Sequence, residues 1–112
     1  MQVTTIIAPA VLRNVPTGAL TALTGAIPAS TGWIVSGLTF ANKTGATVTV
    51  SVTVYDGTND TYLGSTLPIA ANDTVIFGGE NWKLSLPTGW SIRCICNTAS
   101  AVDAVASVVQ FT

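Results

Sequence analysis

The sequence contains no histidine and very little charge, since only 8% of its 112 residues are Asp, Glu, Lys or Arg. Histidine is the side chain that most readily exchanges protons near neutral pH, so acid–base catalysis would have to rely on five carboxylates. An ordinary soluble domain has about 25% charged residues. The shortage predicts that neighbouring protein covers part of the surface, although a neutral surface of Thr and Ser is an alternative interpretation.

Positive charge is also too sparse for several classes of function. The four basic residues are widely spaced, and the net charge is −1. Nucleic-acid binding needs clustered cations to displace counterions, so we expect no nucleic-acid partner. The apolar runs are far shorter than the roughly 20 residues of a membrane-spanning helix, and residues 1–16 lack the charged start and apolar centre of a signal peptide. We therefore expect no membrane partner and synthesis in the cytoplasm.

Cysteine is limited to Cys94 and Cys96. On a strand, residues two apart point to the same face with Cα atoms about 6.5 Å apart, which is near the upper limit of disulfide geometry. We expect free, buried thiols that act as small apolar groups. Two cysteines without histidine cannot complete a zinc shell within one chain, although a site shared between subunits stays open. No glycine-rich phosphate loop opens a helix, so we expect no cofactor.

The clearest positive signal is the strict alternation in residues 46–55. Four valines occupy every second position, and hydroxyl-bearing residues occupy the positions between them. A period of two predicts a β-strand with one apolar and one polar face, and β-branched residues suit a pleated surface. Turn residues at 56–60 and a second extended segment at 61–69 then predict a β-hairpin.

Other parts of the sequence show the same pattern of short extended segments separated by turns. The turn at residues 42–45 predicts a further hairpin between residues 33–40 and residues 46–55. Within residues 33–40, we expect Ile34, Leu38 and Phe40 on one face and Trp33, Val35 and Thr39 on the other. Further strands are expected at residues 2–7, 19–23, 74–77, 82–86, 90–96 and 102–111. The last of these has spacing that also fits a helix, but its β-branched residues favour a strand.

Together these segments predict an all-β fold. About eight short strands, separated by turns and without an amphipathic helix, are typical of an antiparallel β-sandwich of jelly-roll-like form. We divide the chain into an N-terminal arm or edge strand at residues 1–14 and a β-sandwich domain at residues 15–112.

Two groups of residues are candidate binding sites. Asp56 and Asp60 bracket a turn and could bind calcium, but their spacing differs from a calcium loop and aspartates are common in turns, so the turn interpretation is favoured. The three tryptophans Trp33, Trp82 and Trp90 could stack on sugars. Packing in the core or at a subunit interface is the more common role of tryptophan in so apolar a chain.

Several stretches resemble a known group of proteins. They are Val15-Pro16, residues 33–46 (WIVSGLTFANKTGA), 48–50 (VTV), 55–57 (YDG), 84–93 (LSLPTGWSIR) and 101–104 (AVDA). Over residues 15–110 the chain resembles small virion structural proteins of tailed bacteriophages. Those proteins are compact β-sandwiches that decorate or cement a capsid or belong to connector, tail or fibre assemblies. In many of them an aspartate stands where Trp90 is, so the tryptophan adds apolar area at that loop.

The resemblance implies a non-enzymatic capsid decoration or cement protein that is made in the host cytoplasm and located in the virion. Its partners would be other virion proteins, above all the major capsid protein, and further copies of itself in a homo-oligomer. Two alternatives are a structural subunit of a tail, head–tail connector or fibre, and a carbohydrate-binding module at a fibre or spike. An enzyme is the least favoured class, because no residues with a catalytic pattern stand out.

The polar face of residues 46–55 is the predicted contact surface. That strand carries no charge along its whole length, whereas an exposed edge or face usually has a lysine that prevents association. We therefore expect a neighbouring subunit there, and expect Thr49→Lys to weaken assembly without disturbing folding. The predicted subunit interface comprises Trp33, Thr47, Thr49, Ser51, Thr53, Trp82 and Trp90.

Overall fold

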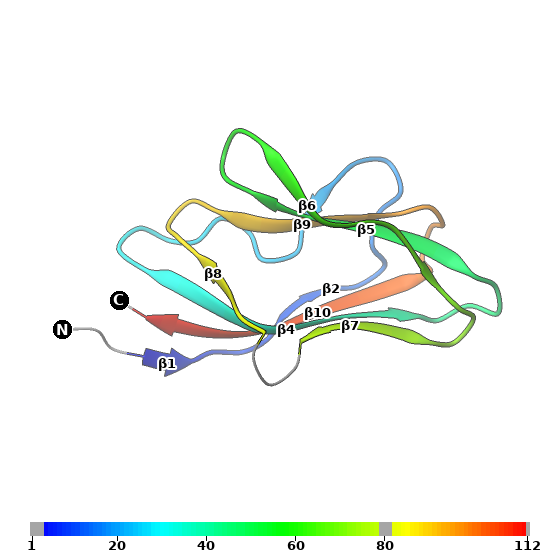
Figure 1. Ribbon diagram of the computed structural model, residues 1–112, viewed down its shortest axis with the longest axis horizontal. Helices are drawn as coiled ribbons and strands as arrows, with labels where there is room; N and C mark the ends of the chain where they lie inside the picture. The colour runs from blue at the N-terminus through cyan, green and yellow to red at the C-terminus, as the bar shows by residue number, and fades with distance from the viewer. Residues whose placement is uncertain (1–3, 79–81, 112) are drawn as a thin grey trace.

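The computed structural model describes residues 4–78 and 82–111. Within these ranges the regular secondary structure consists of ten β-strands in two antiparallel sheets, which lie one above the other (Figure 1). This arrangement confirms the predicted all-β sandwich. No helix in these ranges is long and apolar enough to cross a membrane.

Sheet A is built around two long neighbouring strands, β10 and β4. The short strands β1 and β2 pair with the outer edge of β10, and β7 and β8 pair with the outer edge of β4. Residues 4–12 therefore supply two edge pairings within their own chain, and the separation of residues 1–14 as an arm stays a prediction. The strands of sheet A are β1 (Thr4–Ile6), β2 (Ala10–Leu12), β4 (Gly32–Asn42), β7 (Thr74–Gly78), β8 (Leu84–Leu86) and β10 (Val102–Phe111).

Sheet B has the strand order β3-β9-β5-β6, so the valine-rich strand β5 lies in its interior. The predicted hairpin between β5 and β6 is confirmed. The predicted hairpin between residues 33–40 and 46–55 is wrong, because β4 belongs to sheet A and β5 to sheet B. The connection at residues 43–47 crosses between the sheets instead of folding back within one. The strands of sheet B are β3 (Thr21–Ala22), β5 (Val48–Tyr55), β6 (Asp60–Ile69) and β9 (Ser91–Cys96).

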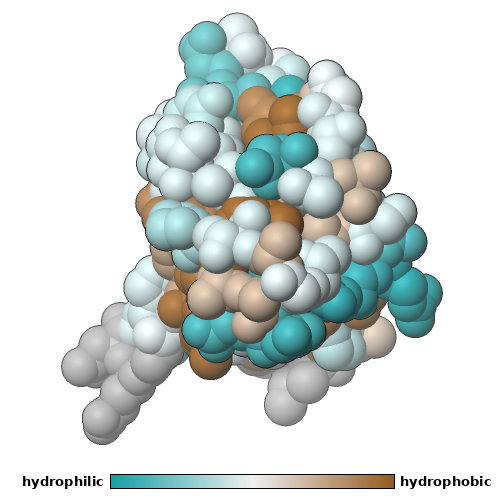
Figure 2. Space-filling model, turned by 90° about the vertical axis from the view of Figure 1, so that its right-hand side faces the viewer, coloured by the Kyte–Doolittle hydropathy of each residue, from teal (hydrophilic) through white to brown (hydrophobic). Residues whose placement is uncertain are grey.

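Asn42 explains why the chain crosses between the sheets at this point. Its side chain is only 3% exposed, and its amide donates to the carbonyl oxygens of Ala46 (2.8 Å), Ile69 (3.0 Å) and Ala70 (3.1 Å). Its carbonyl accepts from the N–H of Thr44 (2.9 Å). These bonds join the β4–β5 connection to the β6–β7 connection, which also passes between the sheets. White and teal side chains cover most of this end of the sandwich, with smaller brown areas between them (Figure 2).

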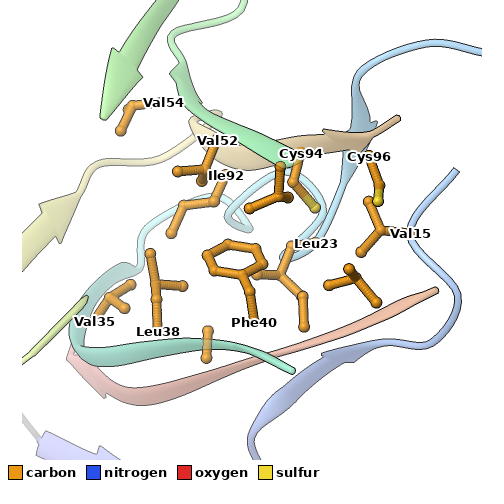
Figure 3. Close-up of a cluster of buried hydrophobic side chains, with 14 of the residues drawn as sticks. Val15, Leu23, Val35, Leu38, Phe40, Val52, Val54, Ile92, Cys94 and Cys96 are labelled. Carbon is orange, nitrogen blue, oxygen red and sulfur yellow. The ribbon is translucent and has the colours of Figure 1, made fainter. Parts of the chain in front are cut away.

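The core lies between the two sheets. Val50 and Val52 of β5 face inward and are 1% and 0% exposed, as the alternation predicted. The Phe40 ring points from sheet A toward Val52 and Cys94 of sheet B (Figure 3). Leu38 beside it is also fully buried. Apolar side chains of both inner faces therefore hold the sheets together.

A β-bulge in β4 overturns one predicted face assignment. Ser107 of β10 pairs with Gly37, but the next residue, Val108, pairs with Val35, which leaves Ser36 as an extra residue. One extra residue moves every preceding side chain to the opposite face. Val35 is consequently buried at 0% exposure and Trp33 packs against the core, whereas Ile34 faces outward, so the prediction was wrong for all three.

The cysteines confirm the predicted free and buried state. Cys94 and Cys96 point inward from β9 and are 0% and 2% exposed. Burial, with a smaller contribution from the neighbouring Cys96, raises the pKa of Cys94 to about 12. The Cys94 thiol therefore stays protonated at neutral pH and packs as an apolar group.

Candidate functional site

The described residues offer few side chains that could bind a metal ion or a small ligand. In the two described stretches of the chain, no three Asp, Glu or Cys side chains gather closely enough to hold a metal ion. Asp56 accepts hydrogen bonds from the backbone N–H groups of Asn59 (2.7 Å) and Thr58 (2.8 Å), and these bonds lower its pKa. The turn interpretation of Asp56 is confirmed. The two outer sheet faces are therefore the candidate functional surfaces.

The outer face of sheet B carries charge over its interior strand β5, toward the β5–β6 turn. The guanidinium of Arg93 on β9 lies 3.2 Å from the carboxylate of Asp60 on β6, and it stacks 4.2 Å from the ring centroid of Tyr55. Asp60 also accepts a 2.7 Å hydrogen bond from the hydroxyl of Thr53. Thr53 is fully buried, so its side chain is not available to a neighbouring subunit, and its place in the predicted interface was wrong.

The uncharged strand thus lies in a charged sheet face. Strand β5 has no charge of its own, but β9 and β6 on either side of it supply Arg93 and Asp60. The expectation that β5 is an exposed edge in need of a covering subunit is also wrong, because β5 is an interior strand. Sheet B therefore carries, on the strands beside β5, the charged residues that oppose association and that β5 itself lacks.

A shallow hollow lies farther along the same face, where the β5–β6 pairing is irregular. Thr66 has a positive φ of 47°, and its N–H donates to the Ser51 hydroxyl at 2.8 Å. The side chain of Asn97 accepts from the N–H of Thr49 at 3.0 Å. The hollow measures about 220 Å³ and is lined by Thr17, Thr49, Ser51, Thr66, Ile95, Cys96 and Asn97. Two predicted interface residues, Thr49 and Ser51, therefore line one uncharged, hydroxyl-rich surface, while Thr47 is exposed just before β5.

The tryptophans do not join this surface. All three are partly buried and pack against the core, which confirms the packing interpretation. The indole N–H of Trp33 donates to Gln110 (3.1 Å), and the Trp82 ring lies 6.5 Å from that of Phe77. Trp90 lies in the loop before β9, where its carbonyl accepts from the N–H of Ile27. Their contact with other subunits stays a prediction.

The outer face of sheet A differs from that of sheet B, and sequence reasoning did not find it. Cross-strand pairing aligns Val11, Val105, Thr39 and Ile76 in one row across four strands. Val11 is 48% exposed and Ile76 is 68% exposed. We call this row the apolar ridge. The only signal in the sequence was the mixed spacing of residues 102–111, which arises because both faces of β10 are apolar.

Two further rows complete this face. The row next to the apolar ridge contains only small residues, Ser107, Gly37 and Gly78, and we call it the trough. Beyond it lie Val109 and Ile34. These described residues, from the apolar ridge to Ile34, include no charged side chain.

No protein-family model matches the sequence, and no curated protein matches it. The fold is nevertheless similar to that of a chain in the structure of infectious bursal disease virus, Gx strain, with a TM-score of 0.54 and 12% identity. The match covers 99% of this chain and 32% of that chain, so this chain spans about a third of the viral protein's length.

Two other solved structures were also matched. A chain from the disulfide-linked pili of Bacillus endospore appendages superposes with a TM-score of 0.51 and 13% identity, covering 97% of this chain and 89% of that chain. A pentameric capsid protein from metagenomic phage sequences has 14% identity over 95% of this chain and 59% of that chain, but its TM-score of 0.42 is too low to bear on the fold. At such identities the likeness defines the class of fold, a two-sheet β-sandwich, and nothing finer.

Proposed function

We propose that this chain is a non-enzymatic structural subunit of a bacteriophage virion, specifically a capsid decoration or cement protein. The observation that carries the proposal is the uncharged middle of the outer face of sheet A, where Val11 and Ile76 lie exposed. Monomeric soluble domains rarely leave a continuous apolar face uncovered. The resemblance to phage virion proteins and the fold likeness to a chain of a virus structure support the same function.

The mechanism is burial of surface between subunits. Removing apolar surface from water contributes about 25 cal/mol per Å², before the cost of association. Many weak contacts repeated over a shell add up, because each bound subunit raises the effective concentration of the next contact. The outer face of sheet A and the hollow on sheet B lie on opposite sides of the sandwich, so one subunit can touch two neighbours, including the major capsid protein.

The second candidate is a subunit of a tail, connector or fibre. The fold likeness to a pilus chain, which covers 89% of that chain, favours it. Those pili are disulfide-linked, whereas Cys94 and Cys96 are buried inside this sandwich. A fibre of this chain would therefore have to be held by non-covalent contacts.

The carbohydrate-binding alternative relied on the tryptophans, and their packing against the core weakens it. A glycan-binding screen of the wild type with a Trp90→Ala control tests this alternative. Absence of binding by the wild type removes it.

Cryo-electron microscopy of purified virions, with quantitative mass spectrometry of the same particles, tests the main proposal. We expect many copies on the capsid surface. A few copies on the tail axis would support the second candidate instead. Detection in the infected-cell lysate but never in particles would overturn both structural functions.

Thr49→Lys tests whether the hollow on sheet B contacts the shell. A lysine there places an unpaired charge in an uncharged contact, so we expect normal folding and lower occupancy on particles. Thr58→Lys, at an exposed position in the β5–β6 turn outside the hollow, is the matched control. Equal occupancy of both variants would remove the hollow from the interface.

A further inference from the structure

The outer face of sheet A has a shape that complements itself. The apolar ridge of Val11, Val105, Thr39 and Ile76 runs beside the trough of Ser107, Gly37 and Gly78. Rows on one face are two residues apart along each strand, or about 6.6 Å. A two-fold axis that runs across the strands, midway between ridge and trough, would place the ridge of each copy in the trough of the other.

The trough is open because its residues are small. A Cβ added at Gly37 would meet its nearest atom, the Phe77 carbonyl oxygen, at 3.7 Å, so the glycine leaves unfilled space above the sheet. The side chain of Ser107 is exposed, and only its backbone carbonyl accepts a hydrogen bond, from the Ser36 hydroxyl at 3.3 Å. Nothing described within the subunit occupies this strip of surface.

The area of the face suits a pair of subunits. Ten residues of β10 extend about 33 Å, and a width of four strands is about 19 Å, which gives about 600 Å² per copy, with Asp103 at the rim of that area. Two copies would bury about 1,200 Å² in total, at the lower end of the range for specific protein–protein interfaces. With a net charge of −1 per chain, repulsion between copies is small.

We propose that two copies of this chain form a dimer by packing the outer faces of sheet A against each other, ridge into trough. The proposal rests on the proposed function in that it names one of its subunit contacts. The two proposals are tested separately, because the dimer is measured on the purified protein and the location on virions. A monomeric protein could still be found on particles, and a dimeric protein could be absent from them.

Sedimentation equilibrium of the purified chain over a wide concentration range tests the dimer. We expect a reversible monomer–dimer equilibrium for the wild type. Ile76→Glu buries an unpaired carboxylate in the interface, so it should raise the dissociation constant about a hundredfold or more. Tyr62→Glu is the control, because Tyr62 is 56% exposed on the outer face of sheet B. Its dissociation constant should match that of the wild type.

A further variant distinguishes packing of the ridge into the trough from non-specific apolar association. Ser107→Phe adds apolar area but fills the trough, so it should weaken the dimer if the ridge occupies the trough. Circular dichroism establishes that each variant is folded, and Val11→Glu at the other end of the ridge replaces Ile76→Glu if that variant unfolds. A monomeric wild type, an unchanged dimer in the ridge variants, loss of the dimer in Tyr62→Glu, or a tighter dimer in Ser107→Phe would each overturn the proposal.

Discussion

The two outer faces of this sandwich belong to sheets of similar width, yet their chemistry differs. Sheet B has an ion pair over its interior strand, near the β5–β6 turn, where Arg93 and Asp60 cross strand β5 and Tyr55 lies beneath the guanidinium. Sheet A has its ion pair at one end, where Lys43 and Asp103 lie 3.0 Å apart, and its middle rows are apolar or small. The same low overall charge is thus distributed in two different ways.

This difference matters because position, more than the amount of charge, decides which face can be covered. A partly buried charge over an interior strand has to be desolvated when a partner binds, whereas a more exposed charge at the rim can stay in water. The residues of β5 indicated sheet B as the contact surface, since that strand is uncharged by itself. The charges of its neighbours favour the opposite sheet for self-association.

The comparison holds only while the two sheets stay stacked, and Asn42 is the polar side chain that joins their connections. Asn42→Ala removes its bonds to Ala46, Ile69 and Ala70 and leaves buried carbonyl groups without a donor. We expect the free energy of unfolding to fall by about 3 kcal/mol, which is the largest of these effects. Urea denaturation measures it.

The control for this variant is Asn97→Ala. Asn97 is exposed, and its side chain accepts one backbone hydrogen bond, from Thr49, so the loss should be about 0.5–1 kcal/mol. Equal losses for both variants would show that Asn42 has no special part in joining the sheets.

Local patterns explain what could be predicted from the sequence. The alternation in residues 46–55 places Val50 and Val52 in the core, and the turn at residues 56–60 closes the β5–β6 hairpin. Both signals lie within a few residues of one another, so no distant part of the chain is needed to interpret them. The inward alternation of Ile92, Cys94 and Cys96 is confirmed for the same reason.

Contacts between distant segments explain what could not be predicted. The Asn42 side chain donates hydrogen bonds to the carbonyl groups of residues 69 and 70 where the chain crosses to the other sheet. No local sequence pattern indicates these distant contacts. The extra residue Ser36 reverses the faces of Ile34 and Val35. The apolar ridge combines residues from four strands that are far apart in the sequence, so neither it nor the charge over β5 could be found before the strand order was known.

Removing the ion pair from sheet B tests whether its charge is what keeps that face from associating. The double variant Arg93→Met with Asp60→Asn makes this part of the face neutral, with an apolar side chain at position 93. We expect a loss of about 1–2 kcal/mol in the free energy of unfolding, because the pair is partly buried and supports Thr53. We also expect new concentration-dependent association in sedimentation velocity, since the charges no longer oppose contact.

The ion pair of sheet A provides the matched control for that double variant. Lys43→Met with Asp103→Asn removes the same charges from the end of sheet A, where the side chains are 42% and 33% exposed. It should lose less stability and gain no new association. New association in both double variants would mean that net polarity, rather than the position of the charge, keeps sheet B uncovered.

The smallest expected effect is the pH dependence contributed by Asp103. The backbone N–H of Asn14 donates to its carboxylate at 2.9 Å, and this bond together with Lys43 lowers the pKa of Asp103 below its ordinary value of 3.8. The carboxylate therefore contributes stability that is fully present above the ordinary value and is lost as the pH falls through the lowered pKa. Because the group is well solvated, the contribution should stay below about 1 kcal/mol.

Thermal unfolding of the wild type and of Asp103→Asn, from neutral pH to well below 3.8, measures this contribution as a double difference. The wild type should lose more stability on acidification than the variant, since the amide cannot be protonated there. Asp56, whose pKa is also lowered, is unchanged in both proteins, so its contribution cancels. Equal acid sensitivity of the two proteins would mean that the bond from Asn14 is not maintained in solution, and that the backbone hydrogen bonds of Val102 and Ala101 hold this end of sheet A without it.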